Sequence, residues 1–193
     1  MSGNTINMPN LYLHNYPGMA VNDLLFSVAE KLTDIQVPYM LSGSFAMSFY
    51  AVSRTTRDID IVAFLQEKDV DSLLLAFDGY YFHRPTIEDE IDRKGMFNII
   101  SNNSGYKIDF IILKQDDYSQ LAFSRRQLLP LDGEMVYVIS IEDLIIAKLK
   151  WIQQLYSERQ ITDIQNLLRS PVIDRDYLLF WTSKLRLNTF ELF

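Results

Sequence analysis

The most informative stretch of this sequence joins Gly43-Ser44 to Asp58-Ile59-Asp60-Ile61, thirteen residues further along the chain. In a β-strand, residues i and i+2 point to the same face, so Asp58 and Asp60 stand side by side. The two isoleucines then face the opposite side, which we expect to be buried. Two carboxylates this close repel each other, and a divalent cation with oxygen ligands relieves the repulsion. An edge strand with two solvated aspartates is the simpler interpretation of the alternation alone.

Gly43-Ser44 lies between a predicted strand at 37–41 and a predicted helix at 45–52. The start of a helix presents free amides to a phosphate group. Glycine lets the backbone approach a ligand closely, and the Ser44 hydroxyl can add a hydrogen-bond donor. A plain turn, or a helix N-cap at Ser44, would also explain the pair.

A third carboxylate, Asp109, lies inside the strongly apolar segment Lys107-Ile108-Asp109-Phe110-Ile111-Ile112-Leu113. An unpaired buried carboxylate is costly, so such a residue is usually paired with a cation or bound to a metal. The alternative to a metal is an ion pair with Arg54, Arg57 or Lys107.

The remaining patterns predict an α/β (α+β) fold with a mixed sheet flanked by helices. Residues 1–139 would form the α/β core and residues 140–193 a C-terminal helical module packed on it. Within the core we expect helices at 21–35 and 70–77 and strands at 58–64, 80–82, 97–101 and 107–113. A hairpin is expected over 128–139. The start of the chain, 1–19, and the charged segment 79–95 are predicted to be irregular. In the module, Ser140 is a predicted cap, with helices at 140–155, 158–169 and 175–184.

The composition excludes several classes of protein. The 193 residues include 25 acidic and 18 basic side chains, two histidines and no cysteine. Disulfides and a cysteine nucleophile are therefore absent, and a multi-histidine zinc site is not expected. The net charge of −7 argues against extensive DNA binding. The uncharged stretch 35–53 contains serine, glycine and proline, so we expect no membrane segment and a cytoplasmic protein.

Two features of the predicted module carry chemistry. Lys148 falls in the middle of the apolar stripe of its helix, where a lysine either extends its ammonium to solvent or meets an anion. Arg159 and Asp163 are four residues apart on the next helix, and a surface ion pair of little energetic value is the simplest interpretation.

Taken together, Gly43-Ser44, the Asp58-x-Asp60 pair and the later Asp109 resemble the nucleotidyltransferase superfamily that includes DNA polymerase β. The segment from Arg54 to Asp60 is similar to the Arg-x-Thr-x-Asp-x-Asp motif of small bacterial members. These members include antibiotic nucleotidyltransferases and toxin-like proteins of abortive-infection and toxin–antitoxin systems. The resemblance covers roughly residues 20–170.

The resemblance implies a function, and it implies roles for particular residues. Asp58, Asp60 and Asp109 would be the catalytic residues and would hold two Mg²⁺ ions, with Mn²⁺ as a substitute. Gly43, Ser44, Arg54, Lys148 and Asp163 would bind the NTP. An NMP group would move to an acceptor hydroxyl on a small molecule, a protein or a tRNA. The alternative is a weakly active or inactive nucleotide-binding protein with an antitoxin-like partner.

Overall fold

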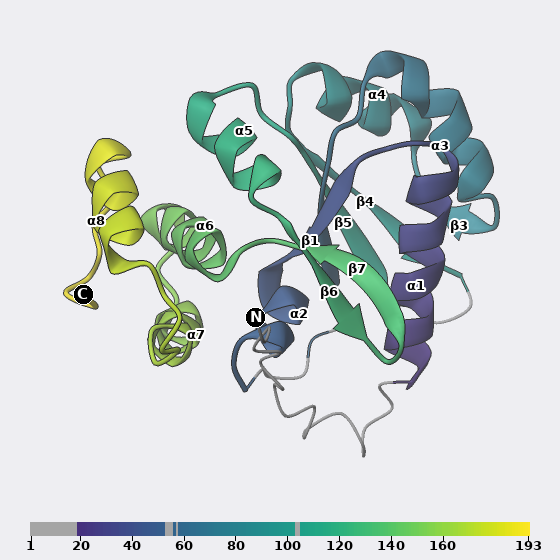
Figure 1. The fold of residues 1–193 in the computed structure, drawn as a ribbon. Coiled ribbons are helices and arrows are strands. Elements are labelled where there is room, and N and C mark those ends of the chain that lie inside the picture. The colour runs from purple at the N-terminus through teal and green to yellow at the C-terminus, as the bar shows by residue number, and fades with distance from the viewer. Residues whose placement is uncertain (1–18, 53–55, 57, 103–104) are drawn as a thin grey trace, which may run out of the picture.

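The computed structural model describes residues 19–52, 56, 58–102 and 105–193, which include a seven-stranded sheet (Figure 1). The strands are β1 (Tyr39–Ser42), β2 (Asp58–Ala63), β3 (Tyr80–Tyr81), β4 (Met96–Ser101), β5 (Lys107–Ile112), β6 (Gln127–Leu131) and β7 (Glu134–Val138). The α-helices are α1 (Met19–Asp34), α2 (Gly43–Ala46), α3 (Val70–Ala76), α4 (Arg84–Asp92), α5 (Asp117–Ser124), α6 (Ile141–Gln154), α7 (Glu158–Leu167) and α8 (Arg175–Lys184). Short 3₁₀ turns cover Met47–Phe49 and Glu67–Asp69.

The sheet is mixed, as predicted, and its strand order is β3-β4-β5-β2-β1-β7-β6. Strand β2 pairs in parallel with β5, and β1 pairs in parallel with β7, whereas the other neighbours are antiparallel. The predicted α/β fold of a mixed sheet flanked by helices is therefore confirmed. None of the helices in the described ranges is long and apolar enough to cross a lipid bilayer.

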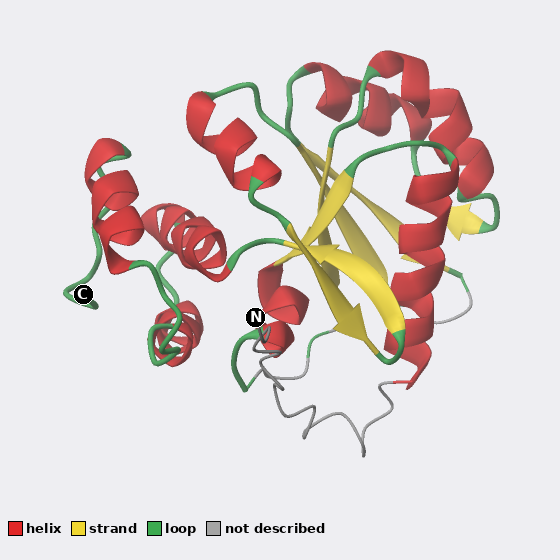
Figure 2. Cartoon of the chain, viewed as in Figure 1, coloured by secondary structure: helices red, strands yellow, loops and turns green. Residues whose placement is uncertain are grey.

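One face of the sheet is a closed hydrophobic core. Helices α1, α3 and α4 lie on this side (Figures 1 and 2). Ile59 and Ile61 are 1% and 0% exposed, which confirms the predicted burial. Phe110 stacks on Phe97 with ring centroids 5.1 Å apart, and Phe77, just after α3, meets Phe110 edge-on. Because this face is sealed, the polar side chains of the same strands must point to the other face.

Helix α6 is held in place by a buried polar network around Asp143. Its carboxylate accepts hydrogen bonds from the hydroxyls of Tyr118 on α5 and Tyr177 on α8, at 3.1 and 2.8 Å. Arg125 donates to the same carboxylate at 3.1 Å. The predicted cap is confirmed, because the Ser140 hydroxyl accepts from the Asp143 amide. The network fixes α6 relative to α5 and α8, and α6 carries Lys148.

The prediction of an irregular segment at 79–95 is wrong, because these residues contain β3 and helix α4. The His83 side chain caps the helix by accepting from the Thr86 amide. Ile87 and Ile91, four residues apart, are both buried, as is Glu90, whereas Glu88, Asp89 and Asp92 are on the solvent side. Helix α5 was not predicted either; Asp116 caps it. The division at residue 139 stays a prediction.

Candidate active site

The three predicted carboxylates meet because β2 and β5 pair in parallel and in register. Asp60 is aligned with Asp109, and Asp58 is aligned with Lys107. Aligned residues share a face of the sheet, so all three carboxylates lie on the face opposite the sealed core. We call Asp58, Asp60 and Asp109 the carboxylate cluster.

Charge repulsion and burial act strongly on Asp60. Burial, followed by the nearby charges of Asp109 and Asp58, raises the pKa of Asp60 to about 6. Lys148 and Lys107 lower that pKa, but their effect is smaller. A carboxyl group in this position gains from an added cation, which is the electrostatic condition of a metal site.

Lys107 brings a cation to the cluster. Its ammonium lies 2.8 Å from Asp109 Oδ2 and 3.7 Å from Asp58 Oδ1. The ion pair raises the pKa of Lys107, chiefly through the hydrogen bond to Asp109. The predicted alternative of a lysine partner for Asp109 is thus present in the structure. The other oxygen, Asp109 Oδ1, is buried and has no hydrogen-bond partner among the described residues.

Gly43 touches the cluster from the end of β1. Its φ of +63° is one that L side chains rarely adopt, and an added Cβ would lie 1.8 Å from Asp60 Oδ2. Glycine is therefore required twice here, for its backbone conformation and for its small size. The close approach predicted for a phosphate is made, in this structure, by the Asp60 carboxylate.

Ser44 lies inside α2 and is buried. The residue at the N-cap position is Ser42, so the interpretation of Ser44 as an N-cap is wrong. Ser42 is aligned with Asp60 across β1 and β2, which brings the start of α2 beside the carboxylate cluster.

Lys148 and Asp163 are both buried and form an ion pair at 2.8 Å. Gln160 also accepts a hydrogen bond from the Lys148 ammonium, at 2.9 Å. The interpretation of Asp163 as half of a surface pair with Arg159 is wrong, because its side chain is 6% exposed and contacts Lys148 of α6. Lys148 meets an anion, as one of the two predictions stated, and its charge is felt at Asp60.

The carboxylate cluster fits a divalent metal in its chemistry. It supplies hard oxygen ligands, repulsion that a cation would relieve, and one buried oxygen that lacks a partner in the described part of the chain. Within the same ranges, however, no group of three or more acidic or histidine side chains is already arranged to hold a metal ion. The Lys107 ammonium, which lies on two of the three carboxylates, is a physical reason for this.

Some site residues were missed or cannot be placed. Arg54 lies outside the described residues. Lys107 was expected only as a possible partner of Asp109, although its position two residues earlier in the strand places both side chains on one face. Gln160 was missed, although it precedes Asp163 by three residues and so shares its helix face.

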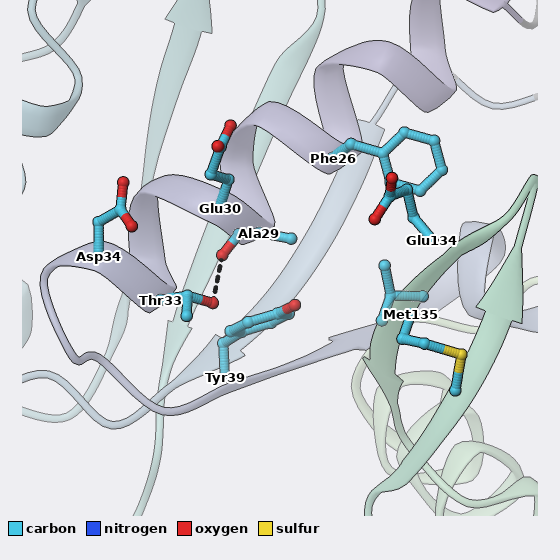
Figure 3. A pocket seen from close by; sticks show the side chains of 9 residues that line it. Phe26, Ala29, Glu30, Thr33, Asp34, Tyr39, Glu134 and Met135 are labelled. Atoms are coloured by element: carbon cyan, nitrogen blue, oxygen red, sulfur yellow. Dashed lines mark hydrogen bonds between the residues drawn. The ribbon is translucent and has the colours of Figure 1, made fainter.

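A separate cavity of about 300 Å³ lies between α1 and the β6–β7 hairpin (Figure 3). It is lined by Phe26, Tyr39, Glu30, Asp34 and Glu134, among others. Tyr39 is at the beginning of β1, whereas Ser42, aligned with Asp60, is at its end. The cavity is therefore not part of the carboxylate cluster.

Solved structures show that this arrangement is a nucleotidyltransferase fold. The antibiotic-resistance factor ANT(2'')-Ia is similar with a TM-score of 0.59 at 11% identity, over 87% of this chain and 92% of the other. The lincosamide antibiotic adenylyltransferase LnuA gives 0.52 at 17% identity, over 76% and 96%. A Thermotoga maritima protein assigned as a nucleotidyltransferase gives 0.52 at 16% identity, over 75% and 92%.

Sequence comparison then identifies the family. The family described as "Nucleotidyltransferase of unknown function (DUF6036)" matches residues 23–184, and the chain belongs to it. No curated protein sequence matches the chain. The predicted superfamily is confirmed, and the protein is an enzyme of the nucleotidyltransferase class.

Proposed function

We propose that this protein transfers an NMP group from an NTP to a hydroxyl group of a small molecule, with Mg²⁺ as cofactor. The observation that carries the proposal is the register of β2 and β5, which aligns Asp60 with Asp109. Next to them lies Gly43, whose Cα is so close to Asp60 that no side chain fits.

A cytoplasmic location stays a prediction of the sequence.

Each residue has a distinct role in this proposal. Asp58, Asp60 and Asp109 would hold Mg²⁺, or Mn²⁺ in its place; the metal would neutralise the charge of the phosphates when bound. Asp109 accepts the proton of the acceptor hydroxyl. The hydroxyl oxygen forms a bond to the α-phosphorus, the bond from that phosphorus to the β-phosphate oxygen breaks, and pyrophosphate leaves.

The remaining residues would hold the nucleotide. The Gly43 amide and the Ser44 hydroxyl would contact the β- and γ-phosphates, and Arg54 would add a positive charge. Lys148 would exchange part of its pairing with Asp163 for the triphosphate, which is consistent with its electrostatic effect on Asp60. Asp163 would then orient the lysine or the base.

The charge distribution supports a small acceptor over tRNA. An RNA-binding surface needs basic side chains that are free to meet phosphates. Several basic residues that could have formed such a patch are paired with acidic ones instead: Arg84 with Asp71 and Glu88, Arg93 with Glu90, and Arg125 with Glu142 and Asp143. LnuA was solved with lincomycin and ANT(2'')-Ia with adenylyl-2''-tobramycin, so this fold accommodates small acceptors.

A direct test is to measure Mg²⁺-dependent NTP binding by calorimetry for the wild type and for Asp58→Ala/Asp60→Ala. Binding is expected in the wild type and lost in the variant. Asp23→Ala/Asp78→Ala, at an exposed position on α1 and an exposed position after α3, is a matched control that removes two acidic groups elsewhere. Equal binding by the wild type and the first variant would refute the site assignment.

One observation favours a second candidate, a weakly active nucleotide-binding protein that acts through a partner such as an antitoxin-like protein. Lys107 already neutralises Asp109 and Asp58, as in a protein that does not need a metal there. The two candidates are separated by incubating the protein with α-labelled NTP, Mg²⁺ and a cell extract. Transfer of label to small molecules supports the enzyme, and nucleotide binding without labelled product supports the second candidate.

A further inference from the structure

The sheet face that carries the carboxylate cluster continues beyond it, across β5 onto β4. The antiparallel register aligns Asn98 of β4 with Asp109 of β5, which is itself aligned with Asp60 of β2. The three side chains therefore point to the same side of the sheet. Asn98 is exposed, so a polar amide lies next to the innermost carboxylate and faces solvent.

Apolar side chains flank Asn98 on this face. Met96 is aligned with Ile111, and Ile111 with Val62, in the row on one side. Ile100, in the row on the other side, is aligned with Lys107. Met96 is 43% exposed, and the three branched side chains are partly exposed. We call this surface the ledge; it consists of Val62, Met96, Asn98, Ile100 and Ile111.

The ledge lies on the β4 side of the cluster, whereas the proposed nucleotide contacts lie on the opposite side, near β1. Gly43 follows β1, and Lys148 is on α6, which contacts α2, so both proposed phosphate contacts lie on the β1 side. In nucleotidyl transfer the attacking and leaving oxygens are roughly in line at phosphorus. If pyrophosphate leaves towards β1, the hydroxyl arrives from β5 and β4, where the ledge is.

The chemistry of the ledge selects a type of molecule. Four of its five side chains are hydrocarbon or thioether, and these favour an apolar surface. The Asn98 amide can both donate to and accept from a neutral hydroxyl or carbonyl group. An ammonium group would lose hydration against these side chains. The carboxylates beside the ledge offer it little in return, because Asp109 and Asp58 are already in contact with the Lys107 ammonium.

We propose that the ledge binds the acceptor, and that the acceptor is an uncharged small molecule with an apolar face beside its reactive hydroxyl. Asn98 sets the position of that hydroxyl by bonding a neighbouring neutral group. This inference rests on the proposed nucleotidyl transfer and deepens it. The overall charge of −7 would by itself favour a cationic acceptor, whereas the local surface of the ledge favours an uncharged one.

The test uses two probes of the same shape: phenyl β-D-glucoside, which is neutral, and its 2-amino-2-deoxy counterpart, which is cationic. Binding is titrated by saturation-transfer NMR with Mg²⁺ and an NTP analogue that has a methylene group between the α- and β-phosphorus. The proteins are the wild type, Met96→Lys, Asn98→Ala and the matched control Met135→Lys. Met135 is also an exposed strand methionine, 51% exposed, but it lies on β7.

We expect the neutral probe to bind at least about fivefold more tightly than the cationic one, a difference of roughly 1 kcal/mol, because the cationic probe must give up hydration of its ammonium group. Met96→Lys and Asn98→Ala should weaken the neutral probe about tenfold and about threefold, while Met135→Lys leaves it unchanged. Preference for the cationic probe, no binding of the neutral one, or equal effects of Met96→Lys and Met135→Lys would each overturn the inference. Binding of the NTP analogue, read in the same samples, tests the proposed function separately.

Discussion

The ammonium of Lys107 lies 2.8 Å from Asp109 Oδ2, so the innermost carboxylate of the cluster already has a cation beside it. The lysine side chain is 39% exposed, and its other contact, Asp58, is 3.7 Å away. A metal ion that binds here competes with this ammonium for the same oxygen. This contact would lower the affinity of the cluster for a metal ion in the absence of nucleotide.

The first prediction concerns this competition. Lys107→Met should tighten Mn²⁺ binding in the absence of nucleotide about fivefold, because the ion pair that the metal must displace is gone, and a partly exposed pair is worth about 1 kcal/mol. Electron paramagnetic resonance of free Mn²⁺ measures the affinity. Lys68→Met, which removes an exposed lysine of the 3₁₀ turn before α3, is the control. Weaker Mn²⁺ binding by Lys107→Met would mean that the lysine supports the metal site.

The second prediction concerns the pH dependence of stability without metal. Asp60 has a folded-state pKa of about 6, raised from 3.8, because folding disfavours its ionised form. Protonated Asp60 therefore contributes to the free energy of unfolding fully below about pH 4, and this contribution is lost as the pH rises through 6. In EDTA, Asp60→Asn should be more stable than the wild type by about 1–2 kcal/mol at pH 8, with little difference at pH 4. Urea unfolding at the two pH values measures this. An advantage equal at both would exclude the titration of Asp60 as its cause, and the exposed Asp78→Asn controls for loss of a negative charge.

The third prediction separates the two reasons for glycine at position 43. Gly43→Ala should lower the free energy of unfolding by about 3 kcal/mol and should abolish NTP binding, because the added Cβ meets Asp60 Oδ2. Gly79→Ala should cost only about 1 kcal/mol, since Gly79 also has a positive φ, +87°, but has nothing within 4 Å of an added Cβ. Similar losses for the two variants would show that conformation alone requires Gly43.

The fourth prediction concerns the buried pair of Lys148 and Asp163. Lys148→Met removes the ammonium 2.8 Å from a buried carboxylate and should cost about 3 kcal/mol. The double variant Lys148→Met/Asp163→Leu should regain at least half of that loss, because no buried charge is left without its partner. Chemical denaturation of both single variants and the double variant completes the cycle. Additive losses would show that the two side chains are not coupled.

Much of the fold follows from short-range patterns in the sequence. Alternating apolar residues predict β2 and β5, and the helical stripe that contains Leu144 and Ile152 predicts α6. Helix α4 was not predicted because its charged residues outnumber its two buried apolar residues, Ile87 and Ile91, and one of the charged residues, Glu90, is buried as well. The short α5 buries Tyr118, Ala122 and Phe123, and Tyr118 packs against Trp181 of α8; such packing is tertiary information.

The candidate site was predictable in its residue types but not in its pairings. The aspartates stand out because carboxylates are rare in apolar strands. Their contact depends on the register of β2 against β5, which lie 43 or more residues apart in the chain and whose alignment no local pattern encodes. The pairing of Lys148 with Asp163 is also not encoded by a local pattern. Asp163 follows Arg159 by four residues whether its carboxylate is exposed or buried against another helix.

During synthesis, the ion pair between α6 and α7 is added after the carboxylate cluster, because Lys148 and Asp163 both follow the cluster in the sequence. A growing chain has made all three aspartates of the cluster once it passes residue 109, but the lysine that moderates the charge at Asp60 follows 39 residues later. That lysine is itself balanced only when Asp163 has been added. Until then, Lys107 is the lysine that offsets the charge of these carboxylates, through its contacts with Asp109 and Asp58. Lys148 and its partner Asp163 can join the carboxylate cluster only after α6 and α7 have left the ribosome.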